Sequence, residues 1–396
     1  MGYIPGGERE MKYNVEKMIA ELCPTGVLYC EMGKLAQIGT GKSNGNEAED
    51  NGEYPFFIRS PIVKRKNCYE YDEEAIIIPG EGGVGDIFHY INGKYALHQR
   101  VYRIHFTTKD VDTRFMYYYL SANFKVFIQR KAVNATVTSI RKPMIEQFPI
   151  PLPPLPIQQE IVRILDTFTN LTAELMAELT ARRKQYEYYR DELLTFGEDT
   201  REVTLREVVK HSCSGGTPSK GNVEYYSNGN IPWIRTQDVR FNEISEVDSY
   251  ITERAVEETS VKWIPKNCVI VAISGASAGR CAINKIEATT NQHCLNMEID
   301  SEKALYKYVF YSICSKYQEL LDKKQGARGD LNSKLILDTK IALPDLNVQK
   351  YIVNILDKFN VIISSLTSGI PAEISARQKQ YEYYRDQLLS FQKEKE

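Results

Sequence analysis

The 396-residue chain lacks the features that mark several large classes of protein. It contains no run of about 18 apolar residues, so no membrane-spanning helix is expected. No charged and apolar leader with a small-residue cleavage site opens the chain, which favours a cytoplasmic protein. The formal net charge is only −2, so overall composition does not by itself indicate a nucleic-acid binder.

The cysteines and histidines show no spacing typical of a disulfide framework or a metal site. The eight cysteines are scattered and form no C-x-x-C, so we expect reduced and mostly buried thiols. His98 and His105 lie seven residues apart in a strand-like segment, which favours a structural role over zinc binding. No metal site is predicted.

Sequence motifs of common enzymes are missing as well. The chain has no H-E-x-x-H and no Asn-Pro-Pro-aromatic run of the kind that amino-methyltransferases use. GASAG (275–279) and GEGGVG (80–85) have the letters of G-x-S-x-G and G-x-G-x-x-G, but we expect neither a nucleophile elbow nor a dinucleotide-binding turn there. AQIGTGKS (36–43) resembles a phosphate-binding loop, but Ala36 replaces the first glycine and NGNEAEDNGEYP follows where such a loop needs a helix. We therefore expect a glycine-rich surface turn whose Lys42 can meet a phosphate, and a binding protein in preference to an enzyme.

An internal repeat dominates what is present. The segment 182–196 matches 377–391 at 12 of 15 positions, and both contain KQYEYYRD. Upstream, LPPLPIQQEIVRILDTF (152–168) matches LPDLNVQKYIVNILDKF (343–359). The two matches have offsets of 195 and 191 residues, so the second copy carries four extra residues between its blocks. The chain consists of two halves with similar ends.

The repeated segments have the periodicity of long helices, because apolar residues recur at steps of three and four. The first copy predicts one helix from about 157 to 194. In the second copy Gly369 and Pro371 predict a break, with Pro371 near the start of another helix. These apolar residues form one stripe along each predicted helix. Antiparallel packing of the two helices is the simplest way to bury both stripes, although each helix could instead pack on its own domain. The predicted seam residues are Ile161, Ile164, Phe168, Leu175, Tyr186, Tyr189, Ile352, Ile355, Phe359, Tyr381 and Tyr384.

The segments that precede each helix predict globular domains of the α+β class. Short β-like runs such as EAIIIPGEGG (74–83) and NCVIVAISGASAG (267–279) alternate with turn signals. Helices are predicted over 114–130 and 304–324. The predicted division is therefore 1–154 and 199–344 for the domains, and 155–198 and 345–396 for the helical regions. Little similarity links the two domains, which suggests one task performed on different targets.

Local charge is informative where net charge is not. Residues 121–142 contain five basic side chains and no acidic one, and Lys64-Arg65-Lys66 forms a second cluster. A solvated face is the usual meaning of such a run. A stretch of this length without an acid, in a chain with more acids than bases, favours a phosphate-facing surface.

The doubled KQYEYYRD, LPPLPIQQEIV and the two domain-plus-helix halves together resemble the specificity subunits of type I restriction–modification systems. GTPSKGNVEYYSNGNIPWIRTQD (216–238) and QGARGDLN (325–332) resemble parts of the target recognition domains of that family. The resemblance covers nearly the whole chain and is weaker in the first domain.

The resemblance implies two target recognition domains held apart by an antiparallel coiled coil with pseudo-twofold symmetry. Each domain would read one half of a split, asymmetric sequence in double-stranded DNA, and spacer length would set the gap between the halves. The subunit would be non-catalytic, with two methyltransferase subunits and restriction (translocase/endonuclease) subunits as partners and no membrane. S-adenosylmethionine, ATP and Mg²⁺ would belong to those partners and not to this chain.

Charge and position within the domains predict the DNA contacts. Arg suits guanine and Asn or Gln suits adenine, while Lys and Arg on phosphates fix the register. Any single one of these side chains could be a plain solvated charge. The predicted contacts are Lys42, Arg59, Lys64, Arg65, Arg130, Lys131 and Arg141 in the first domain, and Lys220, Arg235, Gln237, Arg280, Lys324, Gln325 and Arg328 in the second.

Two other functions compete with this reading. A self-sufficient nuclease or modification enzyme would be active alone with Mg²⁺ or S-adenosylmethionine. A structural scaffold would bind protein partners without sequence-specific DNA binding, but a scaffold has no need of two dissimilar domains.

Overall fold

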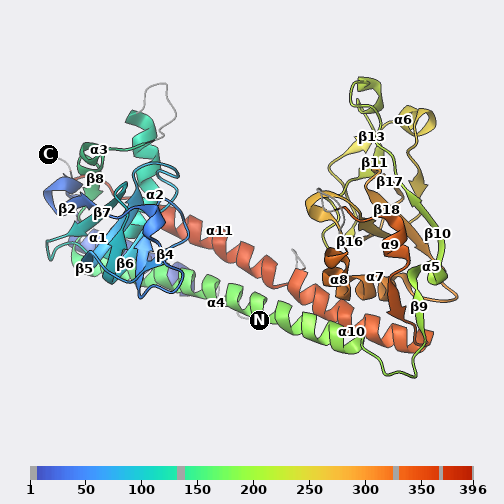
Figure 1. Ribbon diagram of the computed structural model, residues 1–396. Helices are drawn as coiled ribbons and strands as arrows, with labels where there is room; N and C mark the ends of the chain where they lie inside the picture. Colours follow the sequence, from blue (N-terminus) through green and yellow to red (C-terminus); the bar gives the residue numbers. More distant parts are fainter. Residues whose placement is uncertain (1–6, 132–138, 324–329, 365–368, 395–396) are drawn as a thin grey trace. The chain divides into compact units, whose positions relative to one another are not determined.

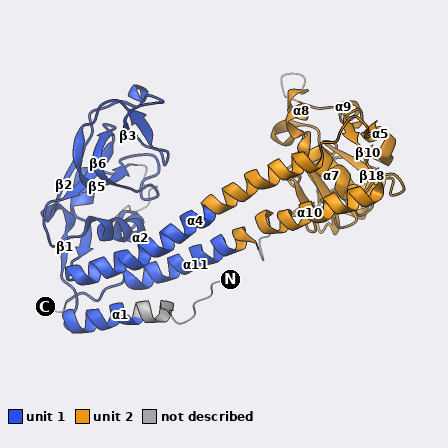
Figure 2. Ribbon diagram, turned by 90° about the horizontal axis from the view of Figure 1, so that it is seen from below, with its two compact units in different colours: residues 1–176, 373–396 blue, residues 177–372 orange. Residues whose placement is uncertain are grey.

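The chain forms two compact units, each with its own core (Figure 2). The computed structural model describes residues 7–131, 139–323, 330–364 and 369–394, without the side chains of 7–12 and 131. Unit 1 contains residues 1–176 and 373–396, and unit 2 contains residues 177–372. Each unit therefore combines one globular domain with segments from both repeated helical regions.

A six-stranded sheet forms the centre of the globular part of unit 1 (Figure 1). Its strand order is β2-β7-β5-β6-β3-β4, and every pair is antiparallel except β3–β6. Ile76 and Ile78 on β5 pack into the core beneath helix α2, while Ile77 packs with Phe57 and Leu97 on the other face. Burial on both faces explains the continuous apolar run of this strand. The strands are β2 (Ala36–Thr40), β3 (Tyr54–Phe57), β4 (Lys64–Lys66), β5 (Tyr71–Pro79), β6 (His89–Leu97) and β7 (Val101–Phe106).

Helices cover this sheet and join it to the helical region. Phe115, Leu120 and Phe124 of α2 are fully buried in the main core of the unit, and Val15 of α1 packs into the same core. Helix α2 confirms the helix predicted over 114–130, whereas α1 was not predicted. The elements are α1 (Gly7–Leu22), β1 (Tyr29–Glu31), η1 (Met32–Lys34), η2 (Gly45–Glu47), α2 (Thr113–Lys131), α3 (Lys142–Glu146) and β8 (Pro149–Pro151), with β1 antiparallel to β8.

The last described residues return to the beginning of unit 1. Val27 donates its N–H to the carbonyl of Gln392 at 2.8 Å, and Glu394 donates its N–H to the carbonyl of Val27 at 3.0 Å. Gly26 adopts a φ of 111° beside the backbone of Glu394, where a Cβ would lie 2.8 Å from the Glu394 nitrogen. Glycine is therefore required for this pairing, because other residues rarely adopt that φ.

Unit 2 is built on two sheets. One has the order β10-β18-β15-β16-β12 and the other β13-β11-β17-β14. NCVIVAISGASAG supplies β15, whose residues Val269–Ala272 are all buried. The strands are β10 (Val209–Ser214), β11 (Ile231–Ile234), β12 (Asn242–Ile244), β13 (Tyr250–Ile251), β14 (Trp263–Ile264), β15 (Val269–Ala272), β16 (Cys281–Asn284), β17 (Ala288–Thr290) and β18 (Cys294–Ile299).

The helix predicted over 304–324 is two helices in the structure. α7 ends at Ser315 and α8 begins at Tyr317, because Lys316 leaves the helical conformation at ψ 8°. Tyr308, Val309 and Ile313 of α7 are buried in the main core of the unit. The remaining elements are β9 (Glu202–Thr204), α5 (Leu205–Val208), η3 (Val223–Tyr225), α6 (Glu253–Glu258), η4 (Gly275–Ser277), α7 (Tyr306–Ser315), α8 (Tyr317–Asp322), α9 (Ser333–Leu337) and β19 (Lys340–Ala342).

The helical regions contain the helices predicted from the repeat, including the break in the second copy. α4 spans Leu155–Leu193 without interruption, and its 39 residues correspond to about 58 Å at about 1.5 Å per residue. The second copy is divided into α10 (Leu346–Ser364) and α11 (Ile370–Leu388). Pro371 is the second residue of α11, where the missing N–H costs no helical hydrogen bond.

Aromatic pairs join the two helical regions within each unit. In unit 1 the rings of Phe168 and Tyr384 stack with centroids 5.4 Å apart. In unit 2 Tyr189 stacks on Phe359 at 5.6 Å. Residue numbers rise along α4 as they fall along its partner, so the pairing is antiparallel, as predicted.

The apolar stripe also packs on the globular domains, which was the alternative expectation. Ile161 and Ile164 share the core of unit 1 with α2, and Ile352 shares that of unit 2 with α7. Leu356, which was not predicted, is fully buried there as well. Of the remaining predicted seam residues, Phe168 is buried, Leu175, Tyr186, Ile355, Phe359, Tyr381 and Tyr384 are half-buried, and Tyr189 is 41% exposed although it is stacked.

One buried glutamine anchors each helical region to its domain. Gln158 and Gln349 occupy equivalent repeat positions and are both fully buried. The Gln158 amide accepts from the N–H of Asp112 at 2.8 Å and donates to the carbonyls of Asp110 and Pro153 at 2.9 and 2.7 Å. The Gln349 amide repeats the pattern with Leu305 N–H and with the carbonyls of Lys303 and Pro344.

A carboxylate two turns further along each helix makes a second attachment. Asp166 accepts hydrogen bonds from Arg114 at 2.9 Å and from the Tyr118 hydroxyl at 2.5 Å. In unit 2 the carboxylate of Asp357 accepts from a lysine and a tyrosine of α7, Lys307 at 2.8 Å and Tyr311 at 2.6 Å. Burial, and after it the hydrogen bond to the carboxylate, raises the pKa of each tyrosine, so both hydroxyls stay protonated donors.

Candidate nucleic-acid interface

The GTGKS stretch is the end of strand β2 and an extended link that bridges to His98 through Ser43, so it is neither the glycine-rich surface turn that we expected nor a phosphate-binding loop that opens an α-helix. Gly41 is buried against Leu97, whose carbonyl oxygen would lie 1.8 Å from an added Cβ. The Ser43 hydroxyl donates to Glu70 at 2.5 Å and accepts from the buried Lys66 ammonium at 2.7 Å. The three-residue η2 follows. Lys42 is the exposed side chain between the buried Gly41 and Ser43.

Several loops of the first domain meet around Ser43. Ser43 donates its N–H to the carbonyl of Leu97 and accepts from the N–H of Gln99, while the N–H of His98 binds the carbonyl of Phe57. The N–H of Gly80 binds the carbonyl of Arg100, and the carbonyl of Gly80 accepts from Ile140. The loops that carry Lys42, Arg59, Arg100 and Arg141 are thereby joined by backbone hydrogen bonds.

One carboxylate at this end of the first domain is shared by two arginines. Glu81 pairs with two arginines, Arg59 and, at 2.6 Å, Arg100, so one positive charge is left in excess. Burial, and after it the charges of Arg59 and Arg100, lowers the pKa of His98. Arg100 was not predicted, although its place in the short turn between β6 and β7 puts it beside Arg59.

The remaining predicted residues of this domain differ in their surroundings. Lys64 is exposed on β4, but the Arg65 guanidinium donates to the carbonyls of Gly52 and Glu53 at 2.8 and 2.6 Å, which ties it to the fold. Arg141 is exposed at the N-terminus of α3. Arg130 is exposed in the last turn of α2, and Lys131 ends that helix with its side chain outside the described residues.

Loops of the second domain meet in the same manner. Gly216 donates its N–H to the carbonyl of Thr290 at 2.9 Å, and Asn291 donates to the carbonyl of Ile234 at 3.0 Å. Ile273 donates to the carbonyl of His293 at 2.9 Å. These bonds bring together the loops that carry Lys220, Arg235, Gln237 and Arg280, of which Lys220 and Gln237 are exposed and the other two half-buried.

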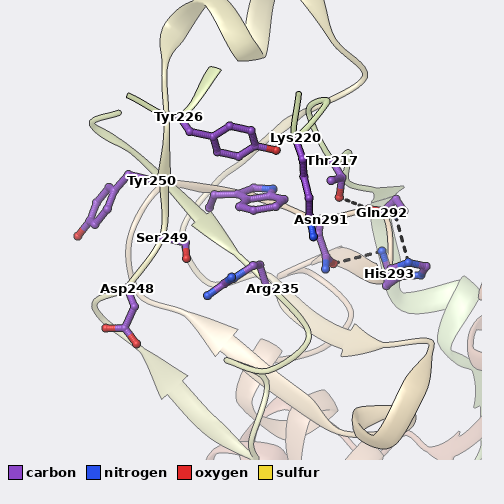
Figure 3. A pocket seen from close by; sticks show the side chains of 11 residues that line it. Thr217, Lys220, Tyr226, Arg235, Asp248, Ser249, Tyr250, Asn291, Gln292 and His293 are labelled. Atoms are coloured by element: carbon purple, nitrogen blue, oxygen red, sulfur yellow. Dashed lines mark hydrogen bonds between the residues drawn. The ribbon is translucent and has the colours of Figure 1, made fainter. Parts of the chain in front are cut away.

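A cavity of about 570 Å³ opens between these loops (Figure 3). In Figure 3 the side chain of Arg235 extends towards Ser249, while Gln292 and His293 lie at the opposite end of the cavity. The amide of Gln292 accepts from the Thr217 hydroxyl and is 3.1 Å from the His293 ring. The cavity is lined by cationic, amide and aromatic side chains and by one carboxylate. The lining residues are Thr217, Lys220, Tyr226, Trp233, Arg235, Asp248, Ser249, Tyr250, Asn291, Gln292 and His293.

Sequence reasoning found two of these side chains, Lys220 and Arg235, and missed the polar run of Asn291, Gln292 and His293. The signal for that run was three polar residues directly after a buried strand, β17. Three predicted contacts, Lys324, Gln325 and Arg328, lie outside the described residues.

The described residues contain no group of three or more His, Cys, Asp or Glu side chains placed to hold a metal ion. All eight cysteines are free thiols, of which four are buried, three half-buried and one, Cys68, exposed. Among the helices within the described ranges, none combines the length and apolarity needed to cross a membrane.

The two loop clusters have the side chains that DNA contacts use. Exposed Lys and Arg can hold phosphates, and guanidinium and amide groups can read base edges. Each cluster belongs to one domain, both offer lysine and arginine, and the second also has the amide side chains of Asn291 and Gln292.

Comparison with protein families gives one match over most of the chain. The family model described as "Type I restriction modification DNA specificity domain" matches residues 27–182 and again 197–376. The two matched segments correspond to the two halves of the internal repeat.

Individual relatives agree with this match. The chain is 41% identical over 292 residues to the specificity subunit of the type I restriction enzyme EcoR124I/EcoR124II of Escherichia coli, an alignment that covers 71% of each protein. It is 32% identical over 368 residues to a putative type I restriction enzyme specificity subunit of Haemophilus influenzae, covering 86% of this chain and 89% of that protein.

A solved structure shows the same fold. The S subunit of a type I restriction–modification system from M. genitalium aligns with a TM-score of 0.56 at 15% identity, covering 92% of this chain and 95% of that chain.

Proposed function

Because the chain belongs to the type I restriction modification DNA specificity family, we propose that its two domains each read one half of a split, asymmetric DNA sequence. The observation that carries this proposal is the pair of loop clusters, which stand on similar scaffolds and both offer lysine and arginine, but in the second the cations lie beside Trp233, Asn291 and Gln292. Lys42, Arg59 and Arg100 belong to one cluster, and Lys220 and Arg235 to the other. Similar scaffolds whose loop clusters have different surroundings suit two different half-sites.

Partner binding by the helical regions is the second part of the proposal. The doubled KQYEYYRD is identical at exposed positions as well as at packed ones: Lys184, Glu187 and Tyr188 in the first copy and Lys379, Glu382 and Tyr383 in the second are all exposed. Packing within the units does not require these exposed side chains to be the same. Binding of two methyltransferase subunits would require identical exposed side chains, because each subunit would contact one of the two KQYEYYRD segments.

In this assembly the chain supplies recognition and the partners supply chemistry. Methyl transfer from S-adenosylmethionine would take place in the methyltransferase subunits, and ATP- and Mg²⁺-dependent cleavage in restriction subunits. This chain would position those subunits by holding both half-sites at once.

The experiment that tests the proposal is co-expression of the chain with its modification subunit, followed by genome-wide mapping of methylated bases. We expect a split motif with a fixed gap that disappears when the chain is omitted. Variants Tyr188→Ala and Tyr383→Ala, made together, should weaken assembly with the modification subunit, whereas Met176→Ala, at another exposed apolar position of α4, serves as the control. An assembled complex that leaves the genome unmethylated and binds all DNA equally would support a structural scaffold instead.

A further inference from the structure

The cavity of the second domain contains a guanidinium group that is held in place but has no described partner. Arg235 follows β11, and its own N–H is fixed by the carboxylate of Asp238 at 2.8 Å. Its guanidinium lies 5.9 Å from the ring centroid of Trp233. The ring is itself fixed, since Trp233 is 7% exposed and its indole N–H donates to the carbonyl of Gly216 at 3.1 Å.

The polar atoms of this guanidinium are left without internal acceptors in the part of the chain that the structure describes. The Nε of Arg235 is buried and makes no hydrogen bond there. Two other arginines of the domain are paired with carboxylates: Arg254 with Glu224 and Glu258, and Arg206 with Asp338. The residue as a whole is only half-buried, so the terminal Nη groups of the guanidinium can reach an acceptor from outside the chain.

We propose that Arg235 reads a guanine in the half-site of the second domain, and that Lys220 holds a neighbouring phosphate. This inference rests on the proposed function and adds which side chain discriminates and which base it selects. Arginine donates two parallel hydrogen bonds to O6 and N7 of guanine in the major groove. Its planar fork fits that edge when the group is pre-oriented, and Trp233 supplies the orientation.

Base reading accounts for the surroundings of Arg235 better than phosphate binding does. The guanidinium is recessed beside an aromatic wall and amide side chains, Asn291 and Gln292, which are groups that contact bases. Lys220 is exposed at the rim, where a mobile point charge suits a backbone phosphate. The two cations are therefore expected to respond differently when they are replaced.

The test compares three variants in the assembled complex with its modification subunit, scored by methylation of every single-base variant of the recognition sequence. Arg235→Ala should relax one guanine position of one half-site, with a loss of about 5- to 150-fold in discrimination there. The other half-site should stay unchanged, which also reports that the complex is folded. Lys220→Ala should lower methylation of all sequences by a similar factor. Arg240→Ala is the control, because this exposed arginine of the same loop donates to the carbonyl of Gln237 at 2.5 Å and does not line the cavity.

Modified DNA provides an independent test of the contact between Arg235 and guanine. Replacing each guanine of the half-site in turn by 7-deazaguanine removes the N7 acceptor, and one such replacement should weaken wild-type binding while leaving Arg235→Ala binding unaffected. Wild-type tolerance of 7-deazaguanine at every position, or a uniform loss across all sequences in Arg235→Ala, would overturn the assignment and leave the split motif intact. Absence of any split motif from the wild-type complex would overturn the proposed function together with this inference.

Discussion

Replacement of Gln158 by methionine tests how the helical region is anchored to the first domain. Methionine has nearly the shape of glutamine but cannot replace the three hydrogen bonds of the amide. The N–H of Asp112 and the carbonyls of Asp110 and Pro153 would lose their partner. One unsatisfied buried donor costs about 1–3 kcal/mol, and with the two carbonyls we expect a total loss of about 2–4 kcal/mol.

Scanning calorimetry measures the loss of stability, and amide hydrogen exchange shows that the loss occurs in unit 1. For a unit of this size the melting temperature of unit 1 should fall by roughly 5–15 °C. Exchange of the Asp112 amide should accelerate, because its acceptor is gone. Since the chain has two units and need not unfold in one step, the exchange data identify which transition has moved.

The neighbouring residue provides a matched control. Gln159 is exposed, so Gln159→Met should leave both transitions unchanged. Gln349→Met should reproduce the effect in unit 2, where the same three-bond pattern holds α10. Equal melting of the Gln158→Met and Gln159→Met proteins would refute the reasoning that the amide anchors the helix.

Two further predictions concern packing. Gly41→Ala should destabilise unit 1 by about 1–3 kcal/mol because its Cβ would collide with the carbonyl of Leu97, whereas Gly39→Ala, whose Cβ would meet only a side chain at 3.5 Å, should have little effect; urea unfolding distinguishes them. The Tyr189–Phe359 stack should contribute about 0.5–1.5 kcal/mol, measured by a double-mutant cycle with Tyr189→Ala and Phe359→Leu, and strict additivity of the two losses would contradict it.

The scaffold could be predicted from the sequence because its signals are local and occur twice. Periodic apolar residues fixed α4 to within two residues at each end, and Gly369 with Pro371 located the break before α11. The helix over 304–324 was predicted as continuous, since no glycine or proline marks the interruption at Lys316. The helix is interrupted because the chain turns between the end of α7 and the start of α8. Packing decides this turn, and residue composition does not reveal it.

The reading surfaces were less accessible to prediction. Lys220 and Arg235 were found by charge, but nothing local indicates that Asn291 lies beside them, because hydrogen bonds between distant loops create that neighbourhood. Charge also selected Arg65, whose guanidinium binds two backbone carbonyls of its own domain. A basic residue in the sequence does not reveal whether its donors are already occupied.

The pairing of residues 392–394 with Val27 has a consequence for the order in which the chain folds during synthesis. Unit 2 is continuous, from 177 to 372, and can close as soon as that segment has left the ribosome. Unit 1 contains both ends of the chain and must wait for α11 and the residues after it. The domain that is translated first is therefore completed last, and a chain that stops before residue 373 would carry a finished second domain beside a first one that still lacks its final helix.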